Sequence, residues 1–261
     1  MKPFILFKNA KIHYNDYGQG EPIVLLHGFL ENSSMWNDFI PVFSKKNRVI
    51  TVDLLGHGKS DCLGYVHSME LMAEAVETVL FKLNVKHAIV IGHSMGGYVA
   101  LAVLEKNPHL LKAICLANST AASDSEEKKK NRERAIKAVK ENHKTFVRLS
   151  IANLFRPKNR SLFKEAFEIV KQEALKTSVQ SVIASLEGMK IRKDRLNLFK
   201  NSNIPKLVIL GKKDAILDYV QQKNYYENTD IKTIEFPDGH MSHIENYKEF
   251  TYNIVHFIEN N

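Results

Sequence analysis

Cysteine is scarce in this chain, since Cys62 and Cys115 are the only two among 261 residues. They lie 53 residues apart in the sequence, which leaves no disulfide scaffold and no cysteine-based zinc site. Long apolar runs are also missing. Phe4-Ile5-Leu6-Phe7 is too short for the core of a signal peptide, and no run approaches the ~20 residues that span a bilayer. We therefore expect a cytoplasmic protein without a membrane span. With 44% apolar and 25% charged residues, it has the composition of an ordinary globular protein with a large core.

The charge is basic overall but unevenly placed. Residues 119–200 hold 20 Lys and Arg against 10 Asp and Glu, whereas the rest of the chain holds 17 against 19. Within this segment, the basic run 128–134 is followed by Ala135, Ile136 and Val139 at helical spacing, which favours the solvated face of an amphipathic helix. The alternative is electrostatic attraction of an anionic substrate or surface. Because one segment holds the excess, we expect a small-molecule substrate and no nucleic-acid partner. The oligomeric state is not indicated.

Short apolar runs alternate with helical patterns, which predicts an α/β fold. Runs typical of buried parallel strands lie at 23–26, 49–52, 88–91, 113–116 and 207–210. The clearest helix is predicted at 68–83 by an apolar stripe. Residues 10–17 suit an edge hairpin strand before the Gly18-Gln19-Gly20 turn. Between Ser119 and about Lys200 only helical periodicity is found, so this segment is predicted to be a helical insertion in one α/β domain.

The most informative motif is Gly92-His93-Ser94-Met95-Gly96, which follows the expected strand 88–91 and precedes a helical stretch at 98–106. A nucleophile on a sharp strand-to-helix turn has strained backbone angles, so the residues two positions away must be very small. Gly92 and Gly96 meet this need. Free N–H groups at a helix N-terminus also stabilise negative charge. The motif predicts that Ser94 is a nucleophile; the alternative is a glycine-rich turn with a capping serine.

With this motif the chain resembles the α/β-hydrolase superfamily over nearly its whole length. His27-Gly28-Phe29 is similar to the family's loop that supplies half of the oxyanion hole, and the match implies that the N–H groups of Phe29 and Met95 bind the oxyanion. Residues 53–60 are similar to the family's turn after the fourth strand, whose role is structural. The resemblance implies a mostly parallel sheet of about eight strands flanked by helices. Residues 1–118 and 201–261 would form the core and residues 119–200 a helical cap.

A serine nucleophile needs a base, and the base needs an orienting carboxylate. In this family the acid follows the serine in the chain and the histidine comes last. Asp214 follows the expected strand 207–210, and His240 follows another at 233–236. Since both lie at the carboxyl ends of strands, we expect them to meet Ser94 at one edge of the sheet. Residues 242–245 fit a capping box with Ser242 as N-cap, which would turn His243 away from the nucleophile.

Several other residues have more than one interpretation. His27 and His57 lack a carboxylate–histidine cluster with ligand spacing, so no metal site and no cofactor are expected. Trp36 is predicted to serve packing more than substrate contact. The apolar positions of the insertion could line an acyl pocket, but for most of them we favour the cap's own small core; they are Phe146, Leu149, Ile151, Leu154 and Phe155.

Together these features predict a serine hydrolase that cleaves a small to medium carboxylic ester through an acyl-enzyme. One alternative uses the same residues for carbon–carbon bond hydrolysis, elimination in menaquinone synthesis or perhydrolysis of an anionic substrate. Tyr98 stands four positions after Ser94, where the menaquinone-pathway members that this chain resembles tend to carry arginine. The other alternative is a non-catalytic ligand-binding protein of the same fold. Aspartate-dependent dehalogenases and epoxide hydrolases are disfavoured because the nucleophile position holds serine.

Overall fold

Eight strands form one sheet in the order β1-β2-β4-β3-β5-β6-β7-β8 in the computed structural model, which describes residues 3–261. The strands are β1 (Phe4–Phe7), β2 (Ala10–Tyr17), β3 (Glu21–Leu26), β4 (Asn47–Val52), β5 (Ala88–His93), β6 (Leu111–Ala117), β7 (Lys206–Gly211) and β8 (Lys232–Phe236). All neighbours from β4 to β8 pair in parallel, while β2 is antiparallel to both β1 and β4. The prediction of a mostly parallel sheet of about eight strands is confirmed.

Residues 10–17 form a strand, but the prediction that this strand is the edge of the sheet was wrong. β1 pairs with residues 10–13 and takes the edge position, while residues 14–17 pair with β4. Lys8 and Asn9 join β1 to β2 and both have positive φ, at 48° and 68°, as a two-residue hairpin turn requires. The short apolar run at the N-terminus is therefore a strand of its own. The expected turn after β2 is present, with Gly18 and Gly20 also at positive φ.

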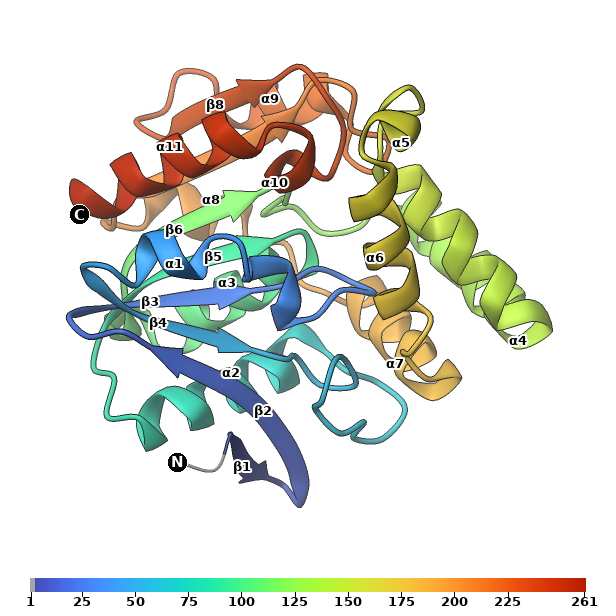
Figure 1. The fold of residues 1–261 in the computed structure, drawn as a ribbon, viewed down its shortest axis with the longest axis horizontal. Coiled ribbons are helices and arrows are strands. Elements are labelled where there is room, and N and C mark those ends of the chain that lie inside the picture. The colour runs from blue at the N-terminus through green and yellow to red at the C-terminus, as the bar shows by residue number, and fades with distance from the viewer. Residues whose placement is uncertain (1–2) are drawn as a thin grey trace.

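Helices cover both faces of the sheet, as the apolar runs require. Outside the insertion the helices are η1 (Ser33–Trp36), α1 (Ile40–Phe43), α2 (Met69–Lys82), α3 (Met95–Lys106), η2 (Pro108–Leu110), α9 (Tyr219–Tyr226), α10 (Ser242–Glu245) and α11 (Tyr247–Glu259). Ile23 and Leu25 pack on the face covered by α1 and α11, whereas Val24 and Leu26 pack on the face covered by α2 and α3. Figure 1 shows these two layers in front of and behind the strands. Burial on both faces explains the continuous apolar sequence of the strands.

Residues between β6 and β7 form helices and no strand: α4 (Glu126–Leu154), α5 (Asn159–Leu162), α6 (Lys164–Ala174), α7 (Val179–Lys190) and α8 (Leu196–Asn201). Figure 1 shows α4, α5, α6 and α7 beyond the end of the sheet toward which the parallel strands point. α4 bends at Asn142, whose φ and ψ of −153° and 85° are non-helical, and the Asn142 side chain accepts a 3.0 Å hydrogen bond from the Thr145 N–H. None of the helices in residues 3–261 is long and apolar enough to cross a membrane.

Most basic residues of α4 are exposed, while Ile136 and Val139 are buried, so the amphipathic interpretation holds for most of the helix. Trp36 is fully buried and its ring lies 5.8 Å from that of Phe39, which agrees with the packing role expected for it.

Candidate active site

The Ser94 turn has the strained geometry that its flanking glycines suggested. Ser94 has φ and ψ of 49° and −116° and stands at the N-terminus of α3. A Cβ on Gly92 would lie 2.5 Å from the backbone of Gly96, and a Cβ on Gly96 would lie 2.4 Å from the Leu26 carbonyl oxygen. The turn is fixed by two hydrogen bonds, from the Ser94 N–H to the Ala117 carbonyl at 2.9 Å and from the Ser119 hydroxyl to the Ser94 carbonyl at 2.7 Å. A larger residue at either glycine would break this packing.

Ser94, His240 and Asp214 meet at the carboxyl ends of β5, β8 and β7. The Ser94 Oγ lies 2.9 Å from His240 Nε2, and His240 Nδ1 lies 2.7 Å from Asp214 Oδ2. Because a carboxylate can only accept a hydrogen bond, Nδ1 carries the proton and donates to Asp214. In the neutral ring this leaves the lone pair of Nε2 to accept the proton of the Ser94 hydroxyl. The three residues that the sequence predicted thus form one continuous hydrogen-bonded chain.

Asp214 is held in place by the turn that follows β7. Its Oδ1 accepts hydrogen bonds from the N–H groups of Ile216 and Leu217, at 2.8 and 3.1 Å. The Asn118 amide donates to Oδ2 at 3.3 Å and also to the Gly239 carbonyl, so Asn118 links the acid to the histidine loop. Burial alone would raise the pKa of the Asp214 carboxyl, but His240 and the two N–H donors hold this pKa below its usual value. The carboxylate is therefore ionised when it orients the ring of His240.

The histidine loop is tied to the end of α4. The His240 N–H donates to the Leu154 carbonyl at 2.9 Å. The Glu245 carboxylate accepts from the Gly239 N–H and from the Arg156 N–H, both at 2.9 Å, and from the Asn159 amide at 2.8 Å. The predicted capping box was therefore wrong. The N-cap of α10 is Met241 and not Ser242. The Glu245 carboxylate bonds the insertion and the histidine loop, so it does not bond the start of its own helix.

The oxyanion loop follows β3 and lies next to the Ser94 turn. Phe29 lines the same cavity as Ser94, and Met95 is the first residue of α3, where a helix leaves its N–H groups without intrahelical partners. Within residues 3–261 neither the Phe29 N–H nor the Met95 N–H donates a hydrogen bond. Both groups predicted for an oxyanion hole are thus free to bind a ligand.

A buried ion pair holds this loop, and the sequence did not point to it. The Glu31 Oε2 lies 2.7 Å from His93 Nδ1 and also accepts from the Gly28 N–H at 2.7 Å. His93 Nε2 lies 3.1 Å from the His240 carbonyl oxygen. Since both ring nitrogens face acceptors that cannot donate, His93 carries two protons and a positive charge. Burial works against both charges, but each partner stabilises the other: the Glu31 pKa is lowered to about 2 and the His93 pKa is raised.

His243 packs against His93, with ring centroids 4.9 Å apart, and against Trp36 and Phe250, and it is not among the residues that line the cavity at Ser94. It is buried, and within residues 3–261 neither of its ring nitrogens has a hydrogen-bond partner. Burial, together with the nearby charge of His93, lowers the His243 pKa to about 3. His243 is therefore neutral and packs behind the site, in agreement with the expectation that it does not reach Ser94.

The other histidines near the loop make structural contacts. His27 uses both ring nitrogens, since Nδ1 bonds the Gly28 carbonyl at 2.7 Å and Nε2 accepts from the Leu54 N–H at 2.9 Å. Asp53, at the start of the turn that was expected to be structural, accepts from the N–H groups of Ser33 and Lys59. Residues 3–261 contain no group of three or more His, Cys, Asp or Glu arranged to hold a metal ion.

A cavity of about 210 Å³ opens in front of Ser94 and His240. Its other lining residues are Phe29, Leu30, Glu31, His93, Tyr98, Arg132, Ser150, Asn153, Leu154, Met189 and Ile216. Of the five apolar insertion positions, Leu154 lines this cavity, Ile151 and Phe155 are buried in the core, and Leu149 is exposed. Phe146 is half-buried against the core. The preference for packing over pocket lining agrees with three of the five positions, since the exposed Leu149 does neither.

Glu31, His93 and Asn118 are the residues of the site that sequence reasoning missed. The sequence contains a weak signal for His93, which is a polar residue at the end of an otherwise apolar strand. It contains another for Glu31, an acidic residue that follows three apolar or small residues in the loop. No local pattern indicated Asn118. It has a φ of 45°, which asparagine tolerates better than most residues.

Comparison with known proteins places the chain in a family. The family model described as alpha/beta hydrolase fold matches residues 21–180. Among curated proteins, the chain is 32% identical over 117 residues to an (E)-2-((N-methylformamido)methylene)succinate hydrolase of Acinetobacter baylyi, covering 45% of this chain and 44% of that protein. It is 35% identical over 125 residues to a 2-hydroxy-6-oxononadienedioate/2-hydroxy-6-oxononatrienedioate hydrolase of Paraburkholderia xenovorans, covering 45% and 43%. The matched region thus spans less than half the length of these two relatives.

Solved structures with the same fold superpose on almost the whole chain. A thermophilic esterase from Thermogutta terrifontis superposes with a TM-score of 0.89 at 28% identity, covering 96% of this chain and 94% of that one. An enol-lactonase from Burkholderia xenovorans gives a TM-score of 0.91 at 22% identity, covering 98% and 100%, which bears on the fold alone. Because the family model matches more than half of this chain, the chain belongs to the α/β-hydrolase fold family.

Proposed function

We propose that this protein is a serine hydrolase that cleaves carboxylic esters of small to medium size through an acyl-enzyme. The observation that carries the proposal is the hydrogen-bonded chain from Asp214 through His240 to Ser94, which ends at the cavity. Its volume of about 210 Å³ lies below the ~300–1,000 Å³ of pockets for drug-sized ligands, which favours a compact substrate.

In this proposal the Ser94 Oγ attacks the ester carbonyl carbon while His240 Nε2 takes the hydroxyl proton. Asp214 keeps the ring in the required tautomer and stabilises the imidazolium that forms. The tetrahedral intermediate carries its negative charge on the former carbonyl oxygen, where the N–H groups of Phe29 and Met95 can donate to it. Loss of one such donor costs about 3 kcal/mol of transition-state stabilisation in related sites.

The intermediate then collapses, and His240 gives its proton to the departing alcohol. A water molecule next attacks the acyl-enzyme, with His240 as base, and releases the carboxylic acid and free Ser94. The helical insertion 119–200 acts in this proposal as a cap, because Leu154, Arg132 and Met189 line the same cavity as Ser94. The likeness to the Thermogutta terrifontis esterase supports ester chemistry.

Covalent labelling tests the proposal directly. A fluorophosphonate probe should label the native protein at Ser94, and the protein should release p-nitrophenol from short-chain p-nitrophenyl esters. Ser94→Ala should abolish both. If the native, folded protein is neither labelled nor active, the alternative of a non-catalytic ligand-binding protein with this fold takes its place.

A second candidate is carbon–carbon bond hydrolysis by the same residues. It is favoured by the similarity to the Paraburkholderia xenovorans hydrolase, whose name specifies an oxo-dioate substrate. Turnover of acidic diketones measured beside simple aryl esters separates the two activities. Elimination of the menaquinone-pathway kind is less well supported because Tyr98 occupies the position of the expected arginine and lines the cavity.

A further inference from the structure

Helix α4 brings one positively charged side chain, Arg132, to the wall of the cavity. Arg132 lines the cavity together with Ser94 and His240, and its side chain is 19% exposed. Its Nε and Nη2 bond the two carboxylate oxygens of Asp124. Within residues 3–261 its third nitrogen, Nη1, has no hydrogen-bond partner, so Arg132 keeps donor capacity beside the proposed nucleophile.

Asp124 serves two arginines at once. Arg192 Nη1 lies 2.6 Å from Asp124 Oδ1, and its guanidinium carbon lies 4.2 Å from the centre of the Tyr98 ring, which also lines the cavity. The remaining contacts of Arg192 are to the carbonyl oxygens of Met189 and Ala122. Two buried or half-buried guanidinium groups therefore share one carboxylate, which leaves one positive charge uncompensated.

Lys128 adds a third cation to this cluster. It stands one helical turn before Arg132 on α4, is half-buried, and makes no ion pair within residues 3–261. Burial lowers the Lys128 pKa, and Arg192 and Arg132 lower it further, against the opposing effects of Asp124 and Asp214.

The acids around this cluster do not balance it. Asp194 accepts from the N–H groups of Ser123 and Leu196, Glu126 is paired with Lys129 at the surface, and Glu133 with Lys190. Of the three cations, the two arginines share Asp124 as their one directly bonded carboxylate, and Lys128 has no carboxylate within ion-pair distance in residues 3–261. Proteins seldom keep buried charges unpaired, because desolvation is costly without a partner. An anionic group that entered the cavity would supply that partner.

We infer that Arg132 forms a carboxylate-binding subsite, supported by the charge of Lys128 one helical turn away, so that the preferred ester carries a free carboxylate on the part that occupies the cavity. This inference rests on the proposed function, since it takes Ser94 as the nucleophile. Arg132 Nη1 would donate to the carboxylate, as guanidinium groups commonly do, and Lys128 would add its charge. The nearly fixed Arg192, bound by Asp124 and stacked on Tyr98, positions Arg132 through their shared carboxylate.

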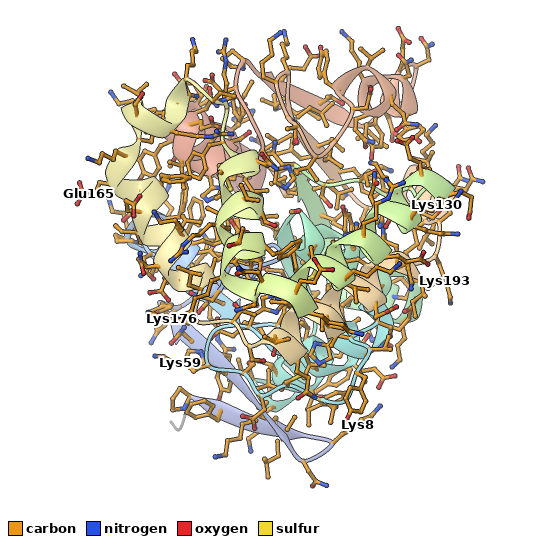
Figure 2. All side chains as sticks on the ribbon, turned by 90° about the vertical axis from the view of Figure 1, so that its right-hand side faces the viewer. Lys8, Lys59, Lys130, Glu165, Lys176 and Lys193 are labelled. Atoms are coloured by element: carbon orange, nitrogen blue, oxygen red, sulfur yellow. The ribbon has the colours of Figure 1, made fainter. Side chains whose placement is uncertain are left out.

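The subsite is distinct from the exposed basic residues of the insertion. Figure 2, which looks onto the insertion, shows Lys130 and Lys193 at the outer rim of this face, with Lys176 on the opposite side. Lys130 is exposed on the same helix as Arg132 and is not among the residues that line the cavity in front of Ser94. It therefore offers a matched control that removes one positive charge without touching the proposed subsite.

The test compares ethyl hemiesters of succinic, glutaric, adipic and suberic acid with neutral ethyl esters of similar length, such as ethyl hexanoate. We expect the wild-type kcat/KM to be at least about tenfold higher for the best hemiester than for its neutral counterpart. Arg132→Gln should reduce that preference at least about tenfold and bring it close to one, in line with the loss of one charge-assisted hydrogen bond. Arg132→Lys should retain part of it, and Lys130→Gln should leave it within about twofold.

Failure of this inference and failure of the proposed function give different results. If Ser94 is labelled by the fluorophosphonate and neutral esters are cleaved without any preference for hemiesters, the subsite is wrong and the hydrolase stands. If Ser94 is not labelled and no ester is cleaved, the hydrolase itself is wrong, and the subsite falls with it.

A second measurement tests the subsite without ester turnover and without the Arg132 variants, in case these fold poorly or the esters react slowly. Adipate should slow fluorophosphonate labelling of wild-type Ser94, whereas the neutral analogue adipamide should not. Lys128→Gln, which removes a half-buried charge without an ion pair, should weaken the protection by adipate several-fold. Equal protection by adipate and adipamide would overturn the subsite.

Discussion

Two carboxylate–histidine pairs lie beside Ser94, and they differ in what the second ring nitrogen faces. The Asp214–His240 and Glu31–His93 pairs both have a ring nitrogen 2.7 Å from a carboxylate oxygen. The Nε2 atom of His240 lies 2.9 Å from the Ser94 hydroxyl, whereas the Nε2 atom of His93 lies 3.1 Å from the His240 carbonyl oxygen. A hydroxyl can exchange a proton with the ring, but a carbonyl oxygen can only accept a hydrogen bond.

The same pair of residue types is therefore suited to two different tasks. His240 can take and return a proton, as the proposed mechanism needs. His93 is held as a fixed positive charge that bonds the oxyanion loop through Glu31 and the histidine loop through the His240 carbonyl. We interpret Glu31 and His93 as positioning residues, because neither has a proton to exchange with Ser94.

The largest expected effect separates His240 from its neighbours. His240→Ala and Ser94→Ala should each lower kcat for p-nitrophenyl esters by about 10⁴–10⁶, because residues of such a chain act as a unit. Ser94→Ala should keep the wild-type circular dichroism and melting temperature within a few degrees, since Ser94 contributes only a small side chain. His240→Ala should keep the wild-type circular dichroism but melt at a lower temperature, because it removes a hydrogen bond to the buried Asp214 carboxylate. A His240→Ala enzyme with near-wild-type kcat would show that the base is another residue.

Breaking the Glu31–His93 pair should lower the free energy of unfolding strongly and lower kcat only moderately. Glu31→Gln leaves the His93 charge buried without its partner, and removal of one member of a buried pair typically costs about 3–5 kcal/mol of unfolding free energy. kcat should fall less than in His240→Ala, because His240 and Ser94 are unchanged. Urea unfolding measures the loss of stability and ester kinetics measure kcat. Glu126→Gln, which replaces an exposed carboxylate at the start of α4, is the control.

The cost of Glu31→Gln should also depend on pH. The Glu31 pKa is lowered to about 2, so its contribution to stability is complete above its unfolded value near 4.5 and is lost as pH falls toward 2. The His93 pKa is raised, so its contribution is complete below its unfolded value of 6.5 and is lost as pH rises through the folded value. The difference between wild type and Glu31→Gln should be largest between about pH 4.5 and 6.5. A difference that grows steadily above pH 7 would contradict the charged state of His93.

Sequence patterns predicted the parts of this fold and site that depend on local residue choice. Buried strands have apolar runs, and the Ser94 turn needs Gly92 and Gly96. Asp214 and His240 were predicted from the chain order that the resemblance to α/β-hydrolases implies, together with the rule that the carboxyl ends of parallel strands meet at one edge. The same reasoning placed the helical insertion, where strand-like runs are absent.

What the sequence did not reveal are contacts between segments that are distant in the chain. Glu31 meets His93 across 62 residues, and Glu245 meets Arg156 across 89. Ser242 and Glu245 have the spacing of a capping box, but tertiary N–H donors compete for the Glu245 carboxylate, and the local pattern cannot register them. The hairpin of β1 was missed for a related reason, since four apolar residues pair only because β2 presents an open edge.

The smallest effect should come from His243, the third histidine of the cluster. It contacts His93 and not Ser94, so His243→Leu should keep kcat within about tenfold. Its pKa of about 3 lies below the unfolded value of 6.5, so the unfolded chain takes up a proton over this interval while the folded chain does not. Stability therefore falls as pH decreases from 6.5 toward 3, by about 1.4 kcal/mol per pH unit for this one group. His243→Leu should remove this share of the total slope, as urea unfolding between pH 6 and 4.5 would show, with His109→Leu at an exposed histidine as the control. Other buried histidines, among them His57 and His67, keep a slope of their own. If the slope does not become smaller in His243→Leu, or if kcat falls as far as in His240→Ala, His243 is not the neutral packing residue that its contact with His93 indicates.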